Sequence, residues 1–395
     1  MKGELKGMHI LDTFLVHYLS HFDKYCFTVV LHDKTYTIGE GDPLFNITIH
    51  KNIPKTELMR STSLALGEAY MRKDITIEGD LFTALQCFLS QQNQFSTDRS
   101  ALKRLLFPSE SKKAQKEQVS SHYDLGNDFY AMWLDPTMSY SCAYFKEETN
   151  TLEEAQRNKV HYILEKLHLE KGMTLLDIGC GWGYLLIEAA QKYDIIGYGC
   201  TLSKEQWKKG QERIAKLGLQ DKVHIDLIDY RDLLDKDMKF DRIVSVGMLE
   251  HVGRSNYPLY MEDTSRLLKD GGMFLLHYIS GRDEKVDNPW MRKYIFPGGT
   301  LPSLREIISL AYDDEYQVID VESLRRHYYK TLMCWYHNFE KVRDKVLATK
   351  GEEFVRMWEL YLVGCAVSFW IGNIDVHQLL MTKGTKNDLP MTRWY

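Results

Sequence analysis

The chain has 395 residues, of which 44% are hydrophobic and 27% are charged, a balance typical of a globular protein large enough for two domains. Disorder throughout the chain, collagen-like repeats and coiled coils are excluded, because apolar residues are frequent and the 26 glycines and 9 prolines follow no period. The net charge of -5 argues against a globally basic nucleic-acid binder.

The cysteines and the apolar segments indicate the compartment. The seven cysteines are odd in number and form no CxxC pair, which argues against a disulfide framework and favours a reducing compartment. No signal peptide is predicted, because His9, Asp12 and His17 interrupt the apolar residues near the N-terminus. The longest nearly apolar stretch, residues 361–374, is too short to span a bilayer. We therefore expect a cytoplasmic protein whose contact with membranes is peripheral.

The first hundred residues predict a small α+β domain over residues 1–105. Alternation of apolar and polar residues predicts strands, and helical spacing predicts helices, one of which begins near Asp80. The predicted segments are a strand and turn at 27–41, a strand at 47–52, a helix at 62–71, and a strand that leads into a helix at 75–92.

A polar segment rich in Ser, Lys and Gln follows at 106–121 and predicts a flexible linker. Strands and helices alternate after it, which predicts an α/β domain with a mostly parallel sheet over residues 122–395. Strand–helix pairs are expected at 174–193 and 194–218, and further strands at 223–233, 241–253 and 271–280. Residues 281–395 are expected to be rich in helix, with an aromatic loop at 289–303 that covers a site.

The motif LLDIGCGWG carries the strongest chemical information. A buried strand is predicted to end at Asp177, and glycines follow at Gly179, Gly181 and Gly183. Glycine lets the backbone turn tightly and approach a ligand closely. The D-x-G-x-G-x-G form does not fit the dinucleotide spacing well and resembles the S-adenosylmethionine (SAM) loop of Rossmann-like class I methyltransferases. A tight strand–helix turn without a ligand is the alternative.

Polar residues follow the next two predicted strands. They are Thr201, Ser203 and Gln206 after the second strand, and Asp229, Tyr230 and Arg231 after the third. Because the carboxyl ends of parallel strands share one edge of a sheet, we expect the first group near the ribose and the second near the adenine of SAM. Tyr230 is suited to stacking on the base, and Asp229 to accepting from its amino group. Each residue alone is equally consistent with an ordinary polar loop.

Seven sequence strings occur in a fixed order. They are HYDLGNDFYAMWLDPTMSYSCAYF (122–145), LLDIGCGWG (175–183), TLSKEQ (201–206), DRIVSVGMLEHVG (241–253), FPGGTLPS (296–303), YYKTLMCW (328–335) and YLVGCAVSFWIGNI (361–374). In these strings the chain resembles the family of cyclopropane-fatty-acyl-phospholipid synthases and mycolic acid cyclopropane synthases. The small N-terminal domain is similar to the one that precedes the catalytic region in the bacterial phospholipid enzymes. Tyr184 and Trp370 depart from the family, which more often has a small residue and Arg there.

The resemblance implies transfer of a methylene from SAM to the cis double bond of an unsaturated acyl chain in a membrane phospholipid. The alkene attacks the sulfonium methyl, and a base must then remove a proton from the new methyl so that the ring closes. The resemblance implies that bound bicarbonate is this base, surrounded by Glu250, His277 and Tyr328 and by main-chain groups near Cys142 and Ile279. His277 and Tyr328 would donate to it, and Glu250 would accept from its hydroxyl.

Other assignments remain open from the residues themselves. Tyr140 and Ser141 are expected to hold the amino-acid part of SAM, and Cys142 to shape the site through its backbone. Without the resemblance, His277 and Tyr328 are better explained as core residues. No metal site is expected, because no HxxxH or cysteine cluster accompanies Glu250. One aromatic set is predicted either to line an acyl channel or to pack in the core: Phe129, Tyr130, Trp133, Phe145, Trp290, Tyr294, Phe296, Trp335 and Phe369.

Contact with the lipid surface is expected to be electrostatic and apolar together. The candidate residues are Lys103, Arg104, Lys112, Lys113 and Lys116, with Leu105, Leu106 and Phe107 beside them. A solvated linker explains them equally well. Alternatively, the N-terminal domain docks on the catalytic domain of a partner subunit, since the resemblance implies a homodimer.

Three rival functions share parts of this pattern. An N-methyltransferase of small amines or phosphoethanolamine would share the SAM loop but needs no bicarbonate site. A variant that completes the cation with water or hydride would give a hydroxylated or methyl-branched chain. A non-catalytic lipid-binding or scaffolding protein would need neither the intact loop nor Glu250 and Tyr328.

Overall fold

The computed structural model describes residues 16–95, 125–284 and 288–395. They form two compact units, each with its own sheet. The predicted linker at 106–121 and the basic residues proposed for lipid contact lie outside the described residues. Within the described ranges, no helix is both long and apolar enough to cross a bilayer.

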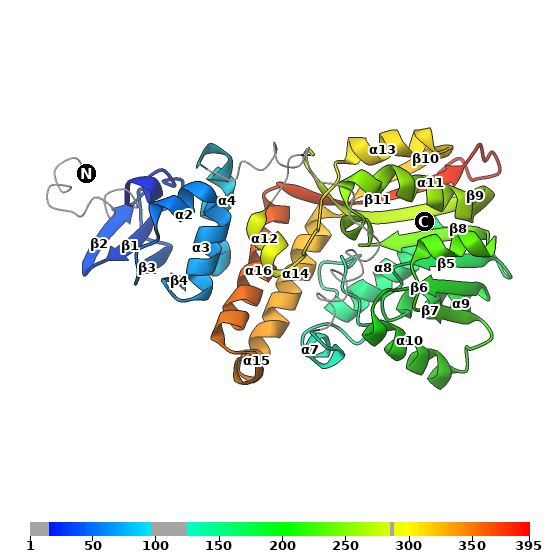
Figure 1. Cartoon of the computed structure of the whole chain (residues 1–395), viewed down its shortest axis with the longest axis horizontal. Coiled ribbons are helices and arrows are strands. Elements are labelled where there is room, and N and C mark those ends of the chain that lie inside the picture. Colours follow the sequence, from blue (N-terminus) through cyan, green and yellow to red (C-terminus); the bar gives the residue numbers. More distant parts are fainter. Residues whose placement is uncertain (1–15, 96–124, 285–287) are drawn as a thin grey trace. The chain divides into compact units, whose positions relative to one another are not determined.

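The first unit is built on a four-stranded sheet in the order β2-β1-β3-β4 (Figure 1). Its elements near the N-terminus are β1 (Phe27–Leu31), β2 (Lys34–Ile38), β3 (Phe45–Ile49), α2 (Lys55–Arg60), α3 (Thr62–Met71), β4 (Ile75–Gly79) and α4 (Leu81–Phe95). The alternating burial of β1 and β3 agrees with the predicted strands. Asp80 begins α4 as predicted, because its carboxylate accepts from the main-chain N–H of Thr83 at 3.0 Å.

Later parts of the chain also belong to the first unit, namely residues 288–295 and 339–371. They contain α12 (Pro289–Tyr294), α15 (Arg343–Lys350) and α16 (Glu352–Trp370), and α16 packs on α3 and α4. The expectation that 289–303 is a loop is therefore wrong for its first part. Asn288 caps α12, and Trp290 is buried against Gly67 and Met71 of α3, so this aromatic residue fills a core.

The second unit contains a seven-stranded sheet in the order β10-β11-β9-β8-β5-β6-β7. Its strands are β5 (Thr174–Ile178), β6 (Ile196–Cys200), β7 (Val223–Asp226), β8 (Phe240–Val246), β9 (Leu268–Gly281), β10 (Tyr316–Ser323) and β11 (Ile374–Lys383). The five predicted strands pair in parallel, and β11 joins antiparallel to β9 and β10. The prediction of an α/β domain with a mostly parallel sheet is confirmed.

Helices cover both faces of this sheet (Figure 1). They are α8 (Leu152–Lys166), α9 (Tyr184–Tyr193), α10 (Lys204–Leu217), α11 (Tyr257–Leu267) and α13 (Leu304–Asp313). Two further helices, α7 (Asn127–Ala131) and α14 (Arg325–Lys341), are not part of these two layers. Apolar residues of α8, α9 and α10 form the core on one face, and those of α11 and α13 form the core on the other. Burial on both faces leaves the carboxyl edge of the parallel strands as the place for polar groups.

Candidate active site

The glycine loop lies between β5 and α9. Gly179 and Gly181 have φ angles of +82° and +55°, a conformation that L side chains rarely adopt. A Cβ atom on Gly181 would meet no protein atom within 4 Å, so the backbone here faces open space. Gly183 differs, because a Cβ atom there would lie 2.5 Å from Ile225 Cδ1. Gly181 is thus available to a ligand, whereas Gly183 allows close packing at the start of α9.

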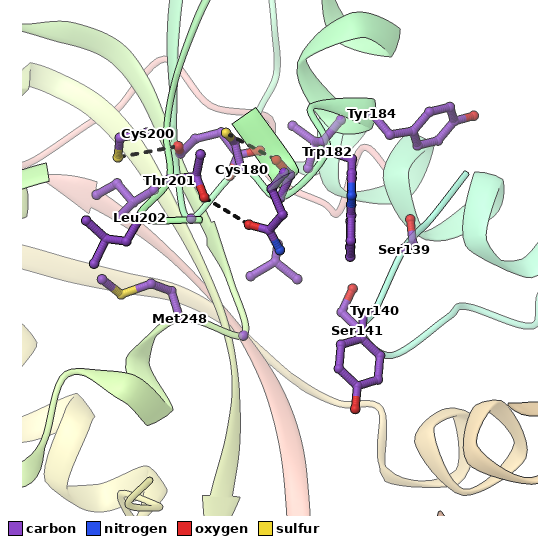
Figure 2. A pocket seen from close by; sticks show the side chains of 18 of the residues that line it. Ser139, Tyr140, Ser141, Cys180, Trp182, Tyr184, Cys200, Thr201, Leu202 and Met248 are labelled. Carbon is purple, nitrogen blue, oxygen red and sulfur yellow. Dashed lines mark hydrogen bonds between the residues drawn. The ribbon is translucent and has the colours of Figure 1, made fainter. Parts of the chain in front are cut away.

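One pocket opens at this edge of the sheet and is lined by loops that follow β5, β6, β7 and β8 and by residues 137–141. Figure 2 shows Tyr140 and Trp182 on one side of it, and Leu202 and Met248 on the other. Ten predicted cofactor residues line it: Tyr140, Ser141, Asp177, Gly179, Gly181, Thr201, Gln206, Asp229, Tyr230 and Arg231. Gly183 and Ser203 are not among the lining residues, and Ser203 instead caps α10.

Polar side chains in the pocket are already ordered by one another. Thr201 Oγ1 donates to Gln206 Oε1 at 2.8 Å (Figure 2). The Asp229 carboxylate accepts from the guanidinium of Arg231 at 2.5 and 2.7 Å, and Tyr230 packs edge-on against Tyr260. This order limits the side-chain entropy that ligand binding would cost.

Lys159 is a pocket residue that the sequence reasoning missed. It lies on the buried face of α8, and its Nζ donates to Ser141 Oγ at 2.8 Å. Burial lowers the pKa of Lys159 to about 8 and raises the pKa of Asp177 to about 7, while the lysine charge opposes the rise at Asp177. A lysine at an apolar position of an amphipathic helix was the available signal. The pair places one basic and one acidic side chain on the wall of the pocket.

Helix α7 begins next to the glycine loop. Trp182 Nε1 donates to Asn127 Oδ1 at 2.8 Å, and Asn127 Nδ2 donates to the carboxylate of Glu205 at 3.2 Å. Helix α7 therefore contacts the loop that lines the pocket.

The residues predicted to bind the base are not among the lining residues of this pocket. Three of them lie on or just after β8 and β9 of the same sheet. Glu250 follows β8, His277 and Ile279 lie on β9, and Val246 of β8 pairs with His277. Glu250 Oε1 accepts from the main-chain N–H of Ile279 at 2.7 Å. Burial raises the pKa of Glu250 to about 7 and lowers the pKa of His277 to about 3, so burial favours the neutral form of both.

Cys142 and Tyr328 both contact the carbonyl oxygen of Leu324, just before the start of α14. Cys142 Sγ lies 3.8 Å from the carbonyl oxygen of Leu324, which also accepts from the main-chain N–H of Tyr328. Burial raises the pKa of the Cys142 thiol, which argues against a thiolate nucleophile. The charge of Lys159 contributes to the pKa shifts of Cys142, Asp177 and His277.

Two buried side-chain atoms near this cluster have no hydrogen-bond partner among the described residues, Glu250 Oε2 and His277 Nε2. Buried polar atoms are normally paired, because an unpaired one costs about 1–3 kcal/mol. Ionised Glu250 can only accept at Oε2, and His277 donates from Nε2 when that nitrogen carries the ring proton, so in these forms the two atoms fit a small oxyanion that carries a hydroxyl. Among the residues that the structure describes, no group of three or more His, Cys, Asp or Glu is placed to hold a metal ion.

The aromatic set predicted for an acyl channel divides between the two units. Tyr130, Trp133 and Trp335 pack with Tyr140 of the pocket, with ring centroids 5.2 to 5.5 Å from it. Trp290, Tyr294 and Phe369 belong to the first unit. None of the nine is a lining residue of the pocket, and the acyl channel stays a prediction.

The two departures from the family pattern have different surroundings. Tyr184 lines the pocket, and its hydroxyl accepts from Arg157 at 3.1 Å. Trp370, at the end of α16, is 45% exposed.

Comparisons with known proteins agree on one family. The family model described as mycolic acid cyclopropane synthetase matches residues 110–379, and one described as a domain of unknown function matches residues 14–100. Cyclopropane-fatty-acyl-phospholipid synthase from Escherichia coli (strain K12) is 42% identical over 345 residues, which cover 85% of this chain and 87% of that protein. A probable fatty acid methyltransferase from Pseudomonas putida is 42% identical over 339 residues, which cover 83% and 85%.

A solved structure gives the same result for the fold. The crystal structure of the mycolic acid cyclopropane synthase CmaA1 complexed with SAH and CTAB has a TM-score of 0.64 and 38% sequence identity. The match covers 68% of this chain and 98% of that chain.

Proposed function

The chain belongs to the mycolic acid cyclopropane synthetase family of SAM-dependent methyltransferases, and from this premise we propose that it converts unsaturated acyl chains of membrane phospholipids to cyclopropane fatty acids. In this reaction SAM supplies the methyl group and bound bicarbonate accepts the proton whose loss closes the ring. The residues of the chain bind and orient both groups, and they exclude water from the cation.

One observation carries the proposal of the base. Glu250 Oε2 and His277 Nε2 are buried atoms without a partner among the described residues, and both belong to the predicted bicarbonate set. Bicarbonate has a hydroxyl that Glu250 accepts and oxygens to which His277 donates. Glu250 Oε1 is fixed by the N–H of Ile279, which leaves Oε2 for this role.

The pocket beside these residues suits the amino-acid part of SAM. We assign the Lys159 ammonium to the SAM carboxylate, together with Ser141, whose hydroxyl already accepts from Lys159. Asp177 is suited to the SAM amino group, since it is the buried carboxylate at the end of β5. The open backbone at Gly181 gives the ligand room to approach.

We also propose that the enzyme acts as a homodimer at the inner face of the cytoplasmic membrane. The family resemblance supports the dimer, and the cluster Lys112, Lys113 and Lys116 supports electrostatic attachment, which is worth about 1 kcal/mol per basic residue and is screened by salt. Changing the three lysines to Glu should weaken binding to anionic vesicles without changing SAM affinity. Unchanged vesicle binding would assign attachment to another surface, and a monomer in sedimentation would contradict the dimer.

Product analysis tests the function as a whole. Purified protein is incubated with SAM and vesicles of a phospholipid that carries a cis-unsaturated chain, and the lipids are analysed by mass spectrometry before and after catalytic hydrogenation. A cyclopropane product gains one CH₂, and it lacks an alkene to hydrogenate under mild conditions. A methyl-branched or hydroxylated chain would favour the fatty acid methyltransferase variant, which the name of the Pseudomonas putida relative suggests. Methylation of the headgroup amine alone would contradict the proposal.

A further inference from the structure

A buried chain of polar contacts leads from α8 to His277. Lys166 Nζ donates to Glu322 Oε2 at 2.5 Å and to Gln378 Oε1 at 2.9 Å. The other end of the Gln378 amide, Nε2, lies 3.2 Å from His277 Nδ1. Lys166, Gln378 and His277 are 0%, 1% and 2% exposed, so water cannot readily substitute for these contacts.

The sheet itself aligns these residues. Glu322 of β10 pairs with Gln378 of β11, and Gln378 pairs with His277 of β9. Side chains directly opposite one another on neighbouring strands project from the same face of the sheet. Lys166 is the last residue of α8, the helix that covers this face, and it contacts Glu322 and Gln378.

Donor and acceptor types fix the direction of every bond in the chain. An ammonium only donates, so the atom of Gln378 that faces Lys166 must be the carbonyl oxygen. The NH₂ group of Gln378 therefore faces His277, and because an amide NH₂ only donates, His277 Nδ1 must accept. The reverse orientation of the amide would place NH₂ against the ammonium and leave buried donors without acceptors.

Groups in direct contact with the lysine favour its charged form. The Glu322 carboxylate contacts it directly, and the rings of Tyr162 and Tyr395 lie 4.4 and 5.0 Å from Nζ. These contacts oppose the effect of burial, which lowers the pKa of Lys166.

The imidazole ring of His277 is neutral near pH 7 and therefore carries only one ring proton. Burial and the nearby charges of Lys159 and Lys166 lower its pKa to about 3, and among the residues that the structure describes no carboxylate opposes this shift. With Nδ1 accepting from Gln378, this single proton must lie on Nε2.

We propose that Gln378 and Lys166 are positioning residues that hold His277 as the Nε2–H tautomer, so that its unpartnered nitrogen is a hydrogen-bond donor to the catalytic anion. The tautomer follows from the contacts alone, whereas its use as a donor to bicarbonate rests on the proposed function. The other tautomer would present a lone pair at Nε2 and repel an anion.

Nuclear magnetic resonance of ¹⁵N-histidine protein measures the tautomer directly, because protonated and unprotonated ring nitrogens have well-separated ¹⁵N shifts. His277→Gln identifies the signals of His277. In the ligand-free wild type we expect Nε2 protonated and Nδ1 unprotonated; the opposite pattern would overturn the inference.

Two variants test the role of Gln378. In Gln378→Glu the carboxylate beside Lys166 can only accept, so Nδ1 should become protonated. In Gln378→Met the donor is absent, and the single-tautomer pattern should be replaced by a mixture. Gln317→Glu, the same change at an exposed position of β10, should leave the His277 signals unchanged. Wild-type signals in both Gln378 variants, or shifted signals in the control, would refute a specific role.

Activity separates this inference from the proposed function. Gln378→Glu should lower turnover by about 10- to 100-fold without changing SAM affinity, since one hydrogen bond to a buried anion is lost. If the wild type forms no cyclopropane but shows the Nε2–H tautomer, the proposed function fails and the positioning contact stands. If it forms cyclopropane but shows the Nδ1–H tautomer, only this inference fails.

Discussion

Replacing Glu250 by Gln should stabilise the free protein at high pH while lowering its activity. The carboxyl group is buried, and burial raises its pKa from an ordinary value of 4.5 to about 7. Hydrogen bonds that the carboxylate accepts from the main chain of Ile279 and of Glu250 itself lower the pKa but do not offset the burial. Ionised Glu250 is therefore a cost to the folded state, which an amide of the same shape does not have.

Proton linkage gives the direction and size of the effect of Glu250 on the free energy of unfolding. The folded wild type binds a proton at Glu250 more tightly than the unfolded chain does, so this group's contribution to stability is present at low pH and is lost as the pH rises from about 4.5 to 7. Between pH 5 and pH 8 the loss is about 2.5 kcal/mol, given about 1.4 kcal/mol per pH unit between the two pKa values. Glu250→Gln removes this dependence. A constant offset from the altered hydrogen bonds is expected at both pH values.

Urea unfolding in bicarbonate-depleted buffer at pH 5 and pH 8 measures the difference in the free energy of unfolding between Glu250→Gln and the wild type. From pH 5 to pH 8 this difference should change in favour of the variant by about 2.5 kcal/mol. Glu212→Gln, a change on the surface of α10 where the carboxylate is 52% exposed, should show little shift. An equal pH dependence in wild type and Glu250→Gln would refute the assignment of a buried, uncompensated carboxyl.

Three further substitutions test the site. Gly181→Ala should weaken SAM binding by about 10-fold or more in calorimetry, because the added Cβ enters the pocket. Gly218 has a similar positive φ but caps α10 away from the pocket, so Gly218→Ala should leave SAM binding unchanged. Lys159→Met should weaken SAM binding by about 10- to 100-fold. The wild-type affinity for SAM should fall above about pH 8, because the Lys159 ammonium is lost there. Lys209→Met, at an exposed position of α10, should change neither the affinity for SAM nor its pH dependence. Tyr328→Phe should lower turnover by about 10- to 100-fold with SAM affinity unchanged, since it removes one donor to the anion; equal loss of SAM affinity would contradict that role.

Local patterns were sufficient to predict the central sheet and the glycine loop. The strand, the D-x-G-x-G-x-G turn and the following helix are adjacent in sequence, and each has its own periodicity or glycine requirement. The edge at which Asp177, Thr201 and Asp229 meet also followed, because parallel strands place successive loops on one side.

Long-range features could not be predicted in the same way. The segment 281–395 was expected to be rich in helix, and it is, but β10 and β11 were missed. Nearly all of β11 is buried, so its residues do not alternate, and a short buried strand resembles a buried helical segment in sequence. The placement of α16 on α3 depends on contacts between distant residues.

The same limit applies to the chemistry of the site. The set Glu250, His277 and Tyr328 came from the family resemblance, since each residue alone resembles an ordinary core or turn residue. Lys159 was missed because it lies on a helix that precedes the glycine loop. The contact of Gln378 with His277 depends on the register of β11 against β9, which the sequence does not specify.

Turnover in bicarbonate-depleted buffer tests the central claim most directly. Purified wild-type protein, SAM and unsaturated phospholipid vesicles are assayed for cyclopropane after removal of bicarbonate, and again after graded re-addition. We predict that activity falls on depletion and returns on re-addition, and that Tyr328→Phe needs more bicarbonate for half of its own maximal rate. Unchanged wild-type turnover, under conditions shown to strip the anion, would contradict the account and make a side chain the base.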